Sequence, residues 1–140
     1  MHNKIQRSCD VLIVLNSLSA EGCPQLAYNL SRYWLSKGIK VQIISLYKYP
    51  LDMLKEFEEI NVRVDFYGDL KKGFIRYFYL VFFTYIFCKK FNPYSVLCFP
   101  FGWHCFIALG AKLSRVKNVC THVGNYPPIK DKKMAKLLDE

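Results

Sequence analysis

The chain has 140 residues, which is the size of one domain. Hydrophobic residues make up 52% of it and aromatic residues 16%, a composition that excludes an intrinsically disordered chain. Twenty Lys or Arg residues against eleven Asp or Glu residues give a net charge of +9. This excess favours polyanionic partners, which include nucleic acid, an anionic membrane surface and phosphorylated substrates. We expect residues 1–8 to form an N-terminal tail and residues 9–140 to form the domain.

Cysteine spacing argues against a metal site. No cysteine pair has the spacing of a zinc knuckle and no His pair completes one, so we expect no metal and treat the thiols as small buried hydrophobes in a reducing compartment. The N-terminus carries basic residues, but Asp10 interrupts any hydrophobic region of a signal peptide. The apolar run at 11–15 is too short for one, which predicts a cytoplasmic location. The six cysteines are Cys9, Cys23, Cys88, Cys98, Cys105 and Cys120.

Strand-like and helix-like segments alternate in the first half of the chain. Residues 11–15 form an unbroken apolar run, typical of a strand buried on both faces. A polar loop follows, and Pro24 then suits the first turn of a helix that ends at Gly38. Residues 41–46 predict a second strand and residues 53–60 a short helix. In residues 62–66 apolar and charged side chains alternate, which indicates a strand near a sheet edge.

The second half continues the alternation. It predicts a long helix over 74–91, stopped by Asn92-Pro93, then a strand over 96–99, a helix over 103–113 and a strand over 118–123. Such alternation favours right-handed crossovers and a parallel sheet. We therefore expect a Rossmann-like, doubly wound α/β fold with strand order 3-2-1-4-5 and helices on both faces. Residues 130–140 look like the opening of another helix, as if the chain were truncated within a larger architecture.

Ligands of such sheets bind beyond the carboxyl ends of the strands, which here brings together the loops 16–23, 100–104 and 122–126. Gly22 precedes a helix and can offer backbone N–H groups to a phosphate, or it can be a simple turn residue. His122 can act as acid, base or hydrogen-bond donor, or it can be structural. The first loop has neither a GxGxxG pattern nor a P-loop, which argues against classical NAD binding. The other candidate cleft residues are Asn16, Ser19, Glu21, His104, Gly124 and Asn125.

Residues 74–88 hold eight aromatic side chains in fifteen positions. The segment is too short to span a membrane and has a charge inside it. It predicts a helix packed on the sheet, an interfacial helix whose aromatics enter an anionic membrane surface, or both on different faces. The segment is too apolar to remain an exposed stacking platform, so nucleic acid ranks last as a partner. The basic residues in and beside it are Lys71, Lys72, Arg76, Lys89 and Lys90.

Several short motifs occur in a characteristic order. Together they resemble the N-terminal domain of a GT-B fold glycosyltransferase of the family-4 type, which is also described as glycosyl transferase group 1. The segments that carry the resemblance lie within residues 9–126 and are VLIVL at 11–15, Gly22-Cys23 where the family has Gly-Gly, LAYNL at 26–30, LSKGIKV at 35–41, NVRV at 61–64, FNPYSV at 91–96 and THVGN at 121–125. Cys23 and Tyr94 depart from the family pattern, which has Gly and Asp there.

The resemblance implies an enzyme of the hexosyltransferase type that moves a sugar from a nucleotide-sugar donor to a carbohydrate or lipid-linked acceptor, as in cell-envelope polysaccharide biosynthesis. It implies that Gly22, with Cys23 beside it, approaches the donor phosphate and that His122 contacts the donor sugar near the reacting centre. The nucleotide sugar is a co-substrate, and no cofactor is expected. In the family a C-terminal domain holds most of the nucleotide, so the chain alone is expected to be inactive. An acceptor of this kind also suits a location at the inner face of a membrane.

A second class of function stays open from the sequence. The same Rossmann-like pattern is compatible with a noncatalytic binding or regulatory module. The sequence following residue 140 would separate the two, because a glycosyltransferase requires a donor-binding half there.

Overall fold

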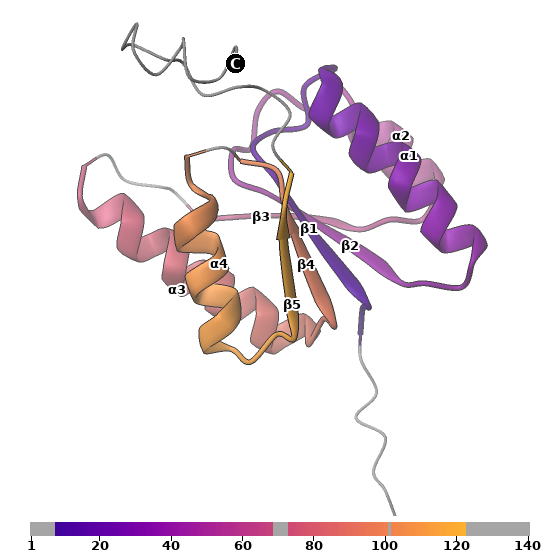
Figure 1. Cartoon of the computed structure of the whole chain (residues 1–140). Helices are drawn as coiled ribbons and strands as arrows, with labels where there is room; N and C mark the ends of the chain where they lie inside the picture. The colour runs from indigo at the N-terminus through magenta and orange to yellow at the C-terminus, as the bar shows by residue number, and fades with distance from the viewer. Residues whose placement is uncertain (1–7, 69–72, 101, 123–140) are drawn as a thin grey trace, which may run out of the picture.

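The computed structural model describes residues 8–68, 73–100 and 102–122. They form five parallel strands in the order β3-β2-β1-β4-β5, with helices on both faces (Figure 1). This confirms the predicted Rossmann-like fold and its strand order. The elements in chain order are β1 (Val11–Leu15), α1 (Gly22–Ser36), β2 (Val41–Ser45), α2 (Leu54–Glu59), β3 (Val64–Phe66), α3 (Ile75–Phe91), β4 (Ser95–Cys98), α4 (His104–Leu113) and β5 (Asn118–Thr121).

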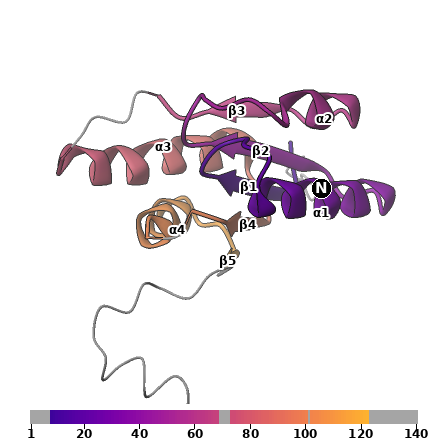
Figure 2. The same ribbon diagram turned by 90° about the horizontal axis from the view of Figure 1, so that it is seen from above.

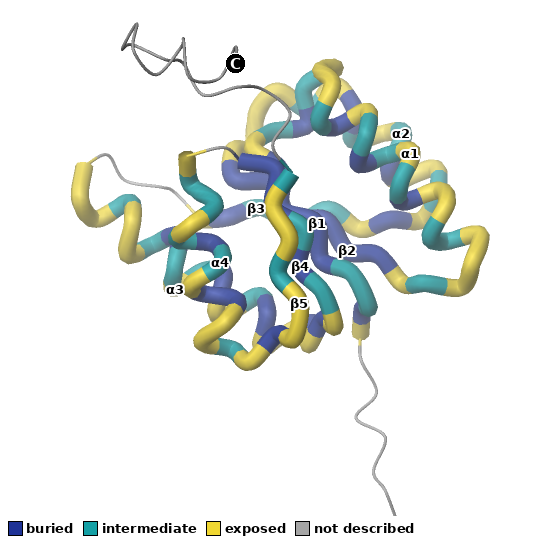
Figure 3. The backbone as a smooth tube through the Cα atoms, in the orientation of Figure 1, coloured by how far each residue is buried: buried dark blue, intermediate teal, exposed yellow. Residues whose placement is uncertain are grey.

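The central strand is the most buried part of the sheet. β1 pairs in parallel with β2 on one side and with β4 on the other, and residues 12–15 are fully buried (Figure 3). A strand enclosed in this way needs apolar side chains on both faces, which is why its sequence does not alternate. β3 lies at an edge, as predicted, and its three residues are all half-buried.

Two separate hydrophobic cores lie on the two faces of the sheet. Seen from above, α1 and α2 lie on one side of the strands, and α3 and α4 lie on the other (Figure 2). The core under α1 and α2 contains Ile13, Ile43 and Phe57. The core under α3 and α4 contains Leu12, Leu80 and Ile107. Successive residues of β1 enter opposite cores, as the period of a strand requires.

Helices α3 and α4 pack closely against each other. A Cβ atom at Gly110 of α4 would lie 2.5 Å from the carbonyl oxygen of Val81 and 2.8 Å from the Cβ of Thr84, both in α3. The Thr84 hydroxyl also shares a 2.5 Å hydrogen bond with the buried Tyr67 hydroxyl at the end of β3. α3 ends as expected at Asn92, which adopts a left-handed conformation with φ of 47°.

The expectation that the cysteines are buried holds for only part of the set. Cys9, Cys88 and Cys98 are buried, and all three belong to the core under α3 and α4. Cys105 and Cys120 are exposed, which corrects the prediction for them. Cys120 is exposed because β5 is an edge strand, of which Val119 is the only residue packed against a core.

Candidate functional site

A small cleft lies where β1 and β4 end, at the point where the strand order reverses. Its volume is about 260 Å³, and it is formed by the β1–α1 loop, the start of α1 and the segment that follows β4. This is the position at which doubly wound sheets bind ligands. The lining residues are Leu15, Asn16, Ser17, Ser19, Glu21, Cys23, Pro24, Phe99, Pro100 and Trp103.

The β1–α1 loop is held in place by the neighbouring loop after β2. The Asn16 carbonyl oxygen accepts a hydrogen bond from the backbone N–H of Tyr47 (2.9 Å), and the Leu18 carbonyl oxygen accepts one from the backbone N–H of Met53 (3.0 Å). The backbone N–H of Ala20 donates to a carboxylate oxygen of Asp52 (3.2 Å). Leu18 is fully buried in the core below. The loop therefore presents its polar groups from a fixed backbone.

The N-terminus of α1 opens toward this loop. Glu21 is the residue before the helix, and its side chain makes no capping hydrogen bond. The first two helical residues, Gly22 and Cys23, are followed by Pro24, which has no N–H group, so the first turn offers fewer donors than usual. A Cβ at Gly22 would have no atom within 4 Å, so the space above this residue is open. The end of a helix dipole and backbone donors favour an anion here.

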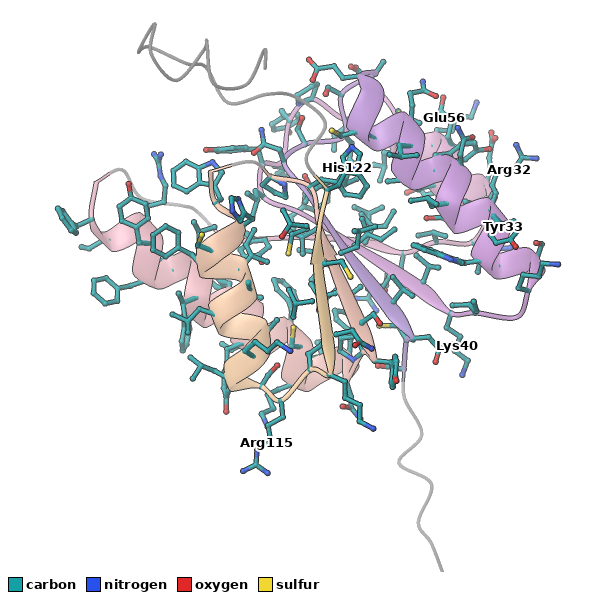
Figure 4. All side chains as sticks on the ribbon, viewed as in Figure 1. Arg32, Tyr33, Lys40, Glu56, Arg115 and His122 are labelled. Atoms are coloured by element: carbon teal, nitrogen blue, oxygen red, sulfur yellow. The ribbon has the colours of Figure 1, made fainter. Side chains whose placement is uncertain are left out.

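His122 lies at the same end of the sheet, directly after β5 (Figure 4). Its backbone N–H donates to the Cys98 carbonyl oxygen (2.9 Å), which extends the β4–β5 ladder by one residue. Its ring centroid lies 5.1 Å from that of Phe99, a residue that lines the cleft. The imidazole therefore sits at the border of the cleft, half-buried.

Only some of the other predicted site residues line the cleft. Asn16, Ser19, Glu21 and Cys23 line the cleft together. His104 begins α4 and is half-buried, but it is not among the lining residues within the described part of the chain. Gly124 and Asn125 lie outside the described residues, as do Lys71 and Lys72.

Sequence reasoning missed the apolar wall of the cleft. Phe99, Pro100 and Trp103 form it, although the prediction concentrated on polar side chains. The Trp103 ring also lies 5.2 Å from the guanidinium carbon of Arg76 and 5.9 Å from the ring of Tyr77, both at the start of α3. A tryptophan beside a loop glycine after a buried strand was a signal that could have identified this wall.

Burial changes the acidity of two thiols in the core under α3 and α4. Burial raises the pKa of Cys98 to about 12, with smaller contributions from Cys88 and Cys120. Burial likewise raises the pKa of Cys88 to about 11. A thiol with a raised pKa is a poor nucleophile and a poor metal ligand at neutral pH. In residues 8–68, 73–100 and 102–122, no three His, Cys, Asp or Glu side chains gather as a metal site.

Comparisons with known proteins identify the fold. No family model matches the chain, and no curated protein matches it in sequence. Among solved structures, it is similar to the lipopolysaccharide outer core galactosyltransferase WaaB in its apo form, with a TM-score of 0.67 and 13% identity over 80% of this chain and 32% of that one. It is also similar to the C-terminal domain of a hydrogenase from Pyrococcus furiosus, with a TM-score of 0.60 and 15% identity over 84% of this chain and 93% of that one.

These likenesses concern the fold. The chain spans about a third of the length of the galactosyltransferase, 32% of it. Within the described ranges, none of the helices has the length and apolar content needed to cross a membrane. The chain therefore has a Rossmann-like α/β fold of the kind that also occurs in a glycosyltransferase.

Proposed function

We propose that the chain is the N-terminal, acceptor-side domain of a GT-B glycosyltransferase, which transfers a sugar from a nucleotide-sugar donor to a carbohydrate or lipid-linked acceptor. The observation that carries the proposal is the cleft at the strand-order switch, with the uncapped N-terminus of α1 opening onto it. The fold shared with a galactosyltransferase and the order of the sequence motifs support it.

The proposed chemistry needs stabilisation of a leaving phosphate. The acceptor hydroxyl oxygen forms a bond to the anomeric carbon and its proton is released to solvent, while the bond from that carbon to the phosphate oxygen breaks and leaves negative charge on the nucleotide. The backbone N–H groups of Gly22 and Cys23 would face that charge, which is where fixed donors contribute most to the rate. His122 would contact the sugar from the other side of the cleft, beyond Phe99.

The size of the cleft supports a requirement for a second domain. Its volume of about 260 Å³ lies below the range of about 300–1,000 Å³ that is typical of small-molecule sites. A nucleotide sugar is a large ligand, so this surface would cover only part of it. A donor-binding domain would supply the rest, and the 140-residue chain alone would then have negligible transferase activity.

Gly22→Ala provides a direct test, because the added methyl group meets no protein atom and Ala suits a helix. We expect uridine diphosphate, added to the ¹⁵N-labelled chain, to shift the backbone amide resonances of Gly22 and Cys23. It should also shift the side-chain ¹⁵N resonances of His122. The Gly22→Ala variant should keep the stability of the wild type but bind about tenfold more weakly, since the methyl group occupies the space a phosphate would need.

The matched control is Gly38→Ala at the other end of α1, where φ is 78°. This variant should lose stability because Ala is strained there, but it should keep the diphosphate-induced shifts. Shifts confined to residues away from the cleft would contradict the proposal. Efficient sugar transfer by the purified 140-residue chain would contradict the requirement for a second domain.

A second candidate is a noncatalytic Rossmann-like binding or regulatory module. The similarity to the hydrogenase domain supports this candidate, because the match covers 93% of that domain and so nearly all of its length. It predicts that no donor-binding half is encoded after Glu140. An in-frame Rossmann-like half with a Glu-x₇-Glu pattern downstream would exclude it.

A further inference from the structure

The outer surface of α3 and α4 is apolar, unlike that of a typical surface helix. Phe74, Phe78 and Phe82 of the α3 region are 84%, 74% and 55% exposed, and Leu109 and Leu113 of α4 are 51% and 58% exposed. A continuous shallow groove of about 1,300 Å³ runs between them. We call this surface the apolar face; its residues are Phe74, Ile75, Tyr77, Phe78, Tyr79, Val81, Phe82, Tyr85, Phe106, Leu109 and Leu113.

The apolar face is a second stripe on α3, distinct from the one that packs on the sheet. The packed stripe consists of Leu80, Thr84, Cys88 and Phe91, which are buried. The opposite stripe includes Phe78, Phe82 and Tyr85, which are exposed and lie about half a turn around the helix from the packed stripe. A helix that is apolar all round is usually buried on every side, so the outer stripe indicates a binding surface.

The charge around the apolar face has one sign. Between Gly73 and His122 the sequence contains six Lys or Arg residues and no Asp or Glu. Lys89 and Lys90 lie in the last turn of α3, and both are exposed. Lys112 lies in the last turn of α4, and Arg115 follows the helix, pointing away from the body of the protein (Figure 4). An aromatic surface next to exposed cations matches the boundary between lipid headgroups and acyl chains.

We propose that the apolar face docks onto the surface of a lipid bilayer that contains anionic headgroups. Phe74, Phe78 and Phe82 would enter the boundary region, while Lys89, Lys90 and the basic end of α4 would contact lipid phosphates. Attraction of the basic residues to anionic lipid and burial of the Phe side chains would both strengthen the attachment. This surface adds to the sugar-transfer proposal and does not depend on it.

A second copy of the chain fits this face less well. A twofold dimer would place the same surface of two protomers in contact, so cations would meet cations. No acidic residue of the segment 73–122 is available to compensate them. The anionic bilayer supplies the opposite charge, and for that reason we choose it as the occupant.

One side chain connects the cleft with the apolar face. Trp103 lines the cleft, and its ring lies near Tyr77 of the apolar face and the Arg76 guanidinium. A protein docked through the apolar face would therefore hold the cleft next to the headgroup layer. This arrangement suits an acceptor whose reactive group stands at the membrane surface.

Vesicle sedimentation tests the proposal with the full chain. We expect binding to phosphatidylglycerol–phosphatidylcholine vesicles, little binding to phosphatidylcholine alone, and weaker binding at high salt. The Phe78→Ser/Phe82→Ser variant and the Lys89→Glu/Lys90→Glu variant should each bind at least about tenfold more weakly. These side chains are exposed, so circular dichroism should show an unchanged fold.

The opposite face supplies matched controls. Tyr33, 59% exposed on α1, can be changed to Ser, and Lys37 and Lys40 can both be changed to Glu. These variants should bind vesicles like the wild type. The proposal would be overturned if the wild type did not bind vesicles, or if variants on both faces lost vesicle binding equally. A stable dimer that the Phe78→Ser/Phe82→Ser change dissociates would also overturn it. Diphosphate binding to Gly22 is measured separately, so either proposal can fail alone.

Discussion

The helices on the two faces of the sheet differ in the side chains that they expose to solvent. On the face covered by α1 and α2, each helix has a polar outer side; Asn29, Arg32, Lys55 and Glu58, for example, are exposed. On the face covered by α3 and α4, the outer side is aromatic and aliphatic. Both faces bury an ordinary hydrophobic core against the same strands. The difference therefore lies in what each helix layer offers on its outside.

The comparison locates the part of the net charge of +9 that lies within the described residues. Residues 8–68 hold six Lys or Arg and seven Asp or Glu residues, so that part of the chain is nearly neutral, whereas residues 73–122 hold six basic residues and no acidic ones. The excess within the described chain thus belongs to the apolar side. A charge total read from composition alone cannot show such an asymmetry, because the two halves cover opposite faces.

The largest effect should come from a matched pair of phenylalanines. Phe57 of α2 is fully buried and packs edge-on against Tyr28, whereas Phe82 of α3 is 55% exposed. We expect Phe57→Ala to lower the free energy of unfolding by about 3–5 kcal/mol and Phe82→Ala to lower it by less than about 0.5 kcal/mol. Urea denaturation measures both. Similar losses would show that the outer side of α3 is packed rather than free.

A somewhat smaller effect is expected where the helices of the apolar side meet. Gly110→Ala places a methyl group 2.5 Å from the Val81 carbonyl oxygen, so α3 and α4 must move apart. The free energy of unfolding should fall by about 1–3 kcal/mol. Gly22→Ala, which meets no atom, is the control and should leave it unchanged. Equal stability of both variants would contradict the close packing of α3 on α4.

Alkaline pH should destabilise the protein through the core under α3 and α4. Burial raises the pKa of Cys9 and Cys98 to about 12 and that of Cys88 to about 11. Above about pH 8.5 these thiols lose their protons in the unfolded chain but keep them in the folded protein. Their contribution to the free energy of unfolding is therefore complete below that pH, and it decreases as the pH rises toward the pKa values of the folded protein.

We expect the free energy of unfolding to fall by about 2 kcal/mol between pH 8 and pH 9 for the three thiols together, within the limit of about 1.4 kcal/mol per pH unit for each thiol. Cys98→Ala should make this decrease shallower. The same alteration at the exposed Cys105 should leave the slope unchanged. Thermal or urea unfolding at several pH values provides the measurement, and a slope that does not respond to Cys98→Ala would contradict the assignment.

The smallest effect is predicted at the edge of the α1 and α2 side. The Arg63 guanidinium lies 3.4 Å from the Asp65 carboxylate, and the Arg63 side chain is 67% exposed. Exposed ion pairs contribute little, so Arg63→Ala should change the free energy of unfolding by less than about 0.5 kcal/mol. Asp65→Ala should cost more, because it also removes the acceptor of the hydrogen bond from the buried Gln42 amide (3.1 Å).

Sequence patterns were sufficient for the fold because they are local. The apolar run at 11–15 predicted a strand with the observed bounds, and the alternation at 62–66 placed β3 at an edge. The contact of Gly110 with Val81 could not be predicted, since it depends on how closely two helices approach in space.

The candidate site was predicted only in part. The topology rule placed Asn16, Ser19 and Glu21 at one edge of the sheet, and the structure brings them into one cleft. The rule carries no information on side-chain direction, so it could not separate His104, which is not among the lining residues, from Trp103 one residue earlier. The roles proposed for Gly22 and His122 remain predictions.

The two edge strands have a consequence for behaviour at high concentration. β3 has three residues and is preceded by the exposed Arg63, and β5 has four residues, among them the exposed Asn118 and Thr121. Strands this short and polar are poor templates for adding a strand from another molecule. Uncontrolled self-association should therefore proceed through helical surfaces, and a mild detergent should suppress it without any change in the backbone pairing of the sheet.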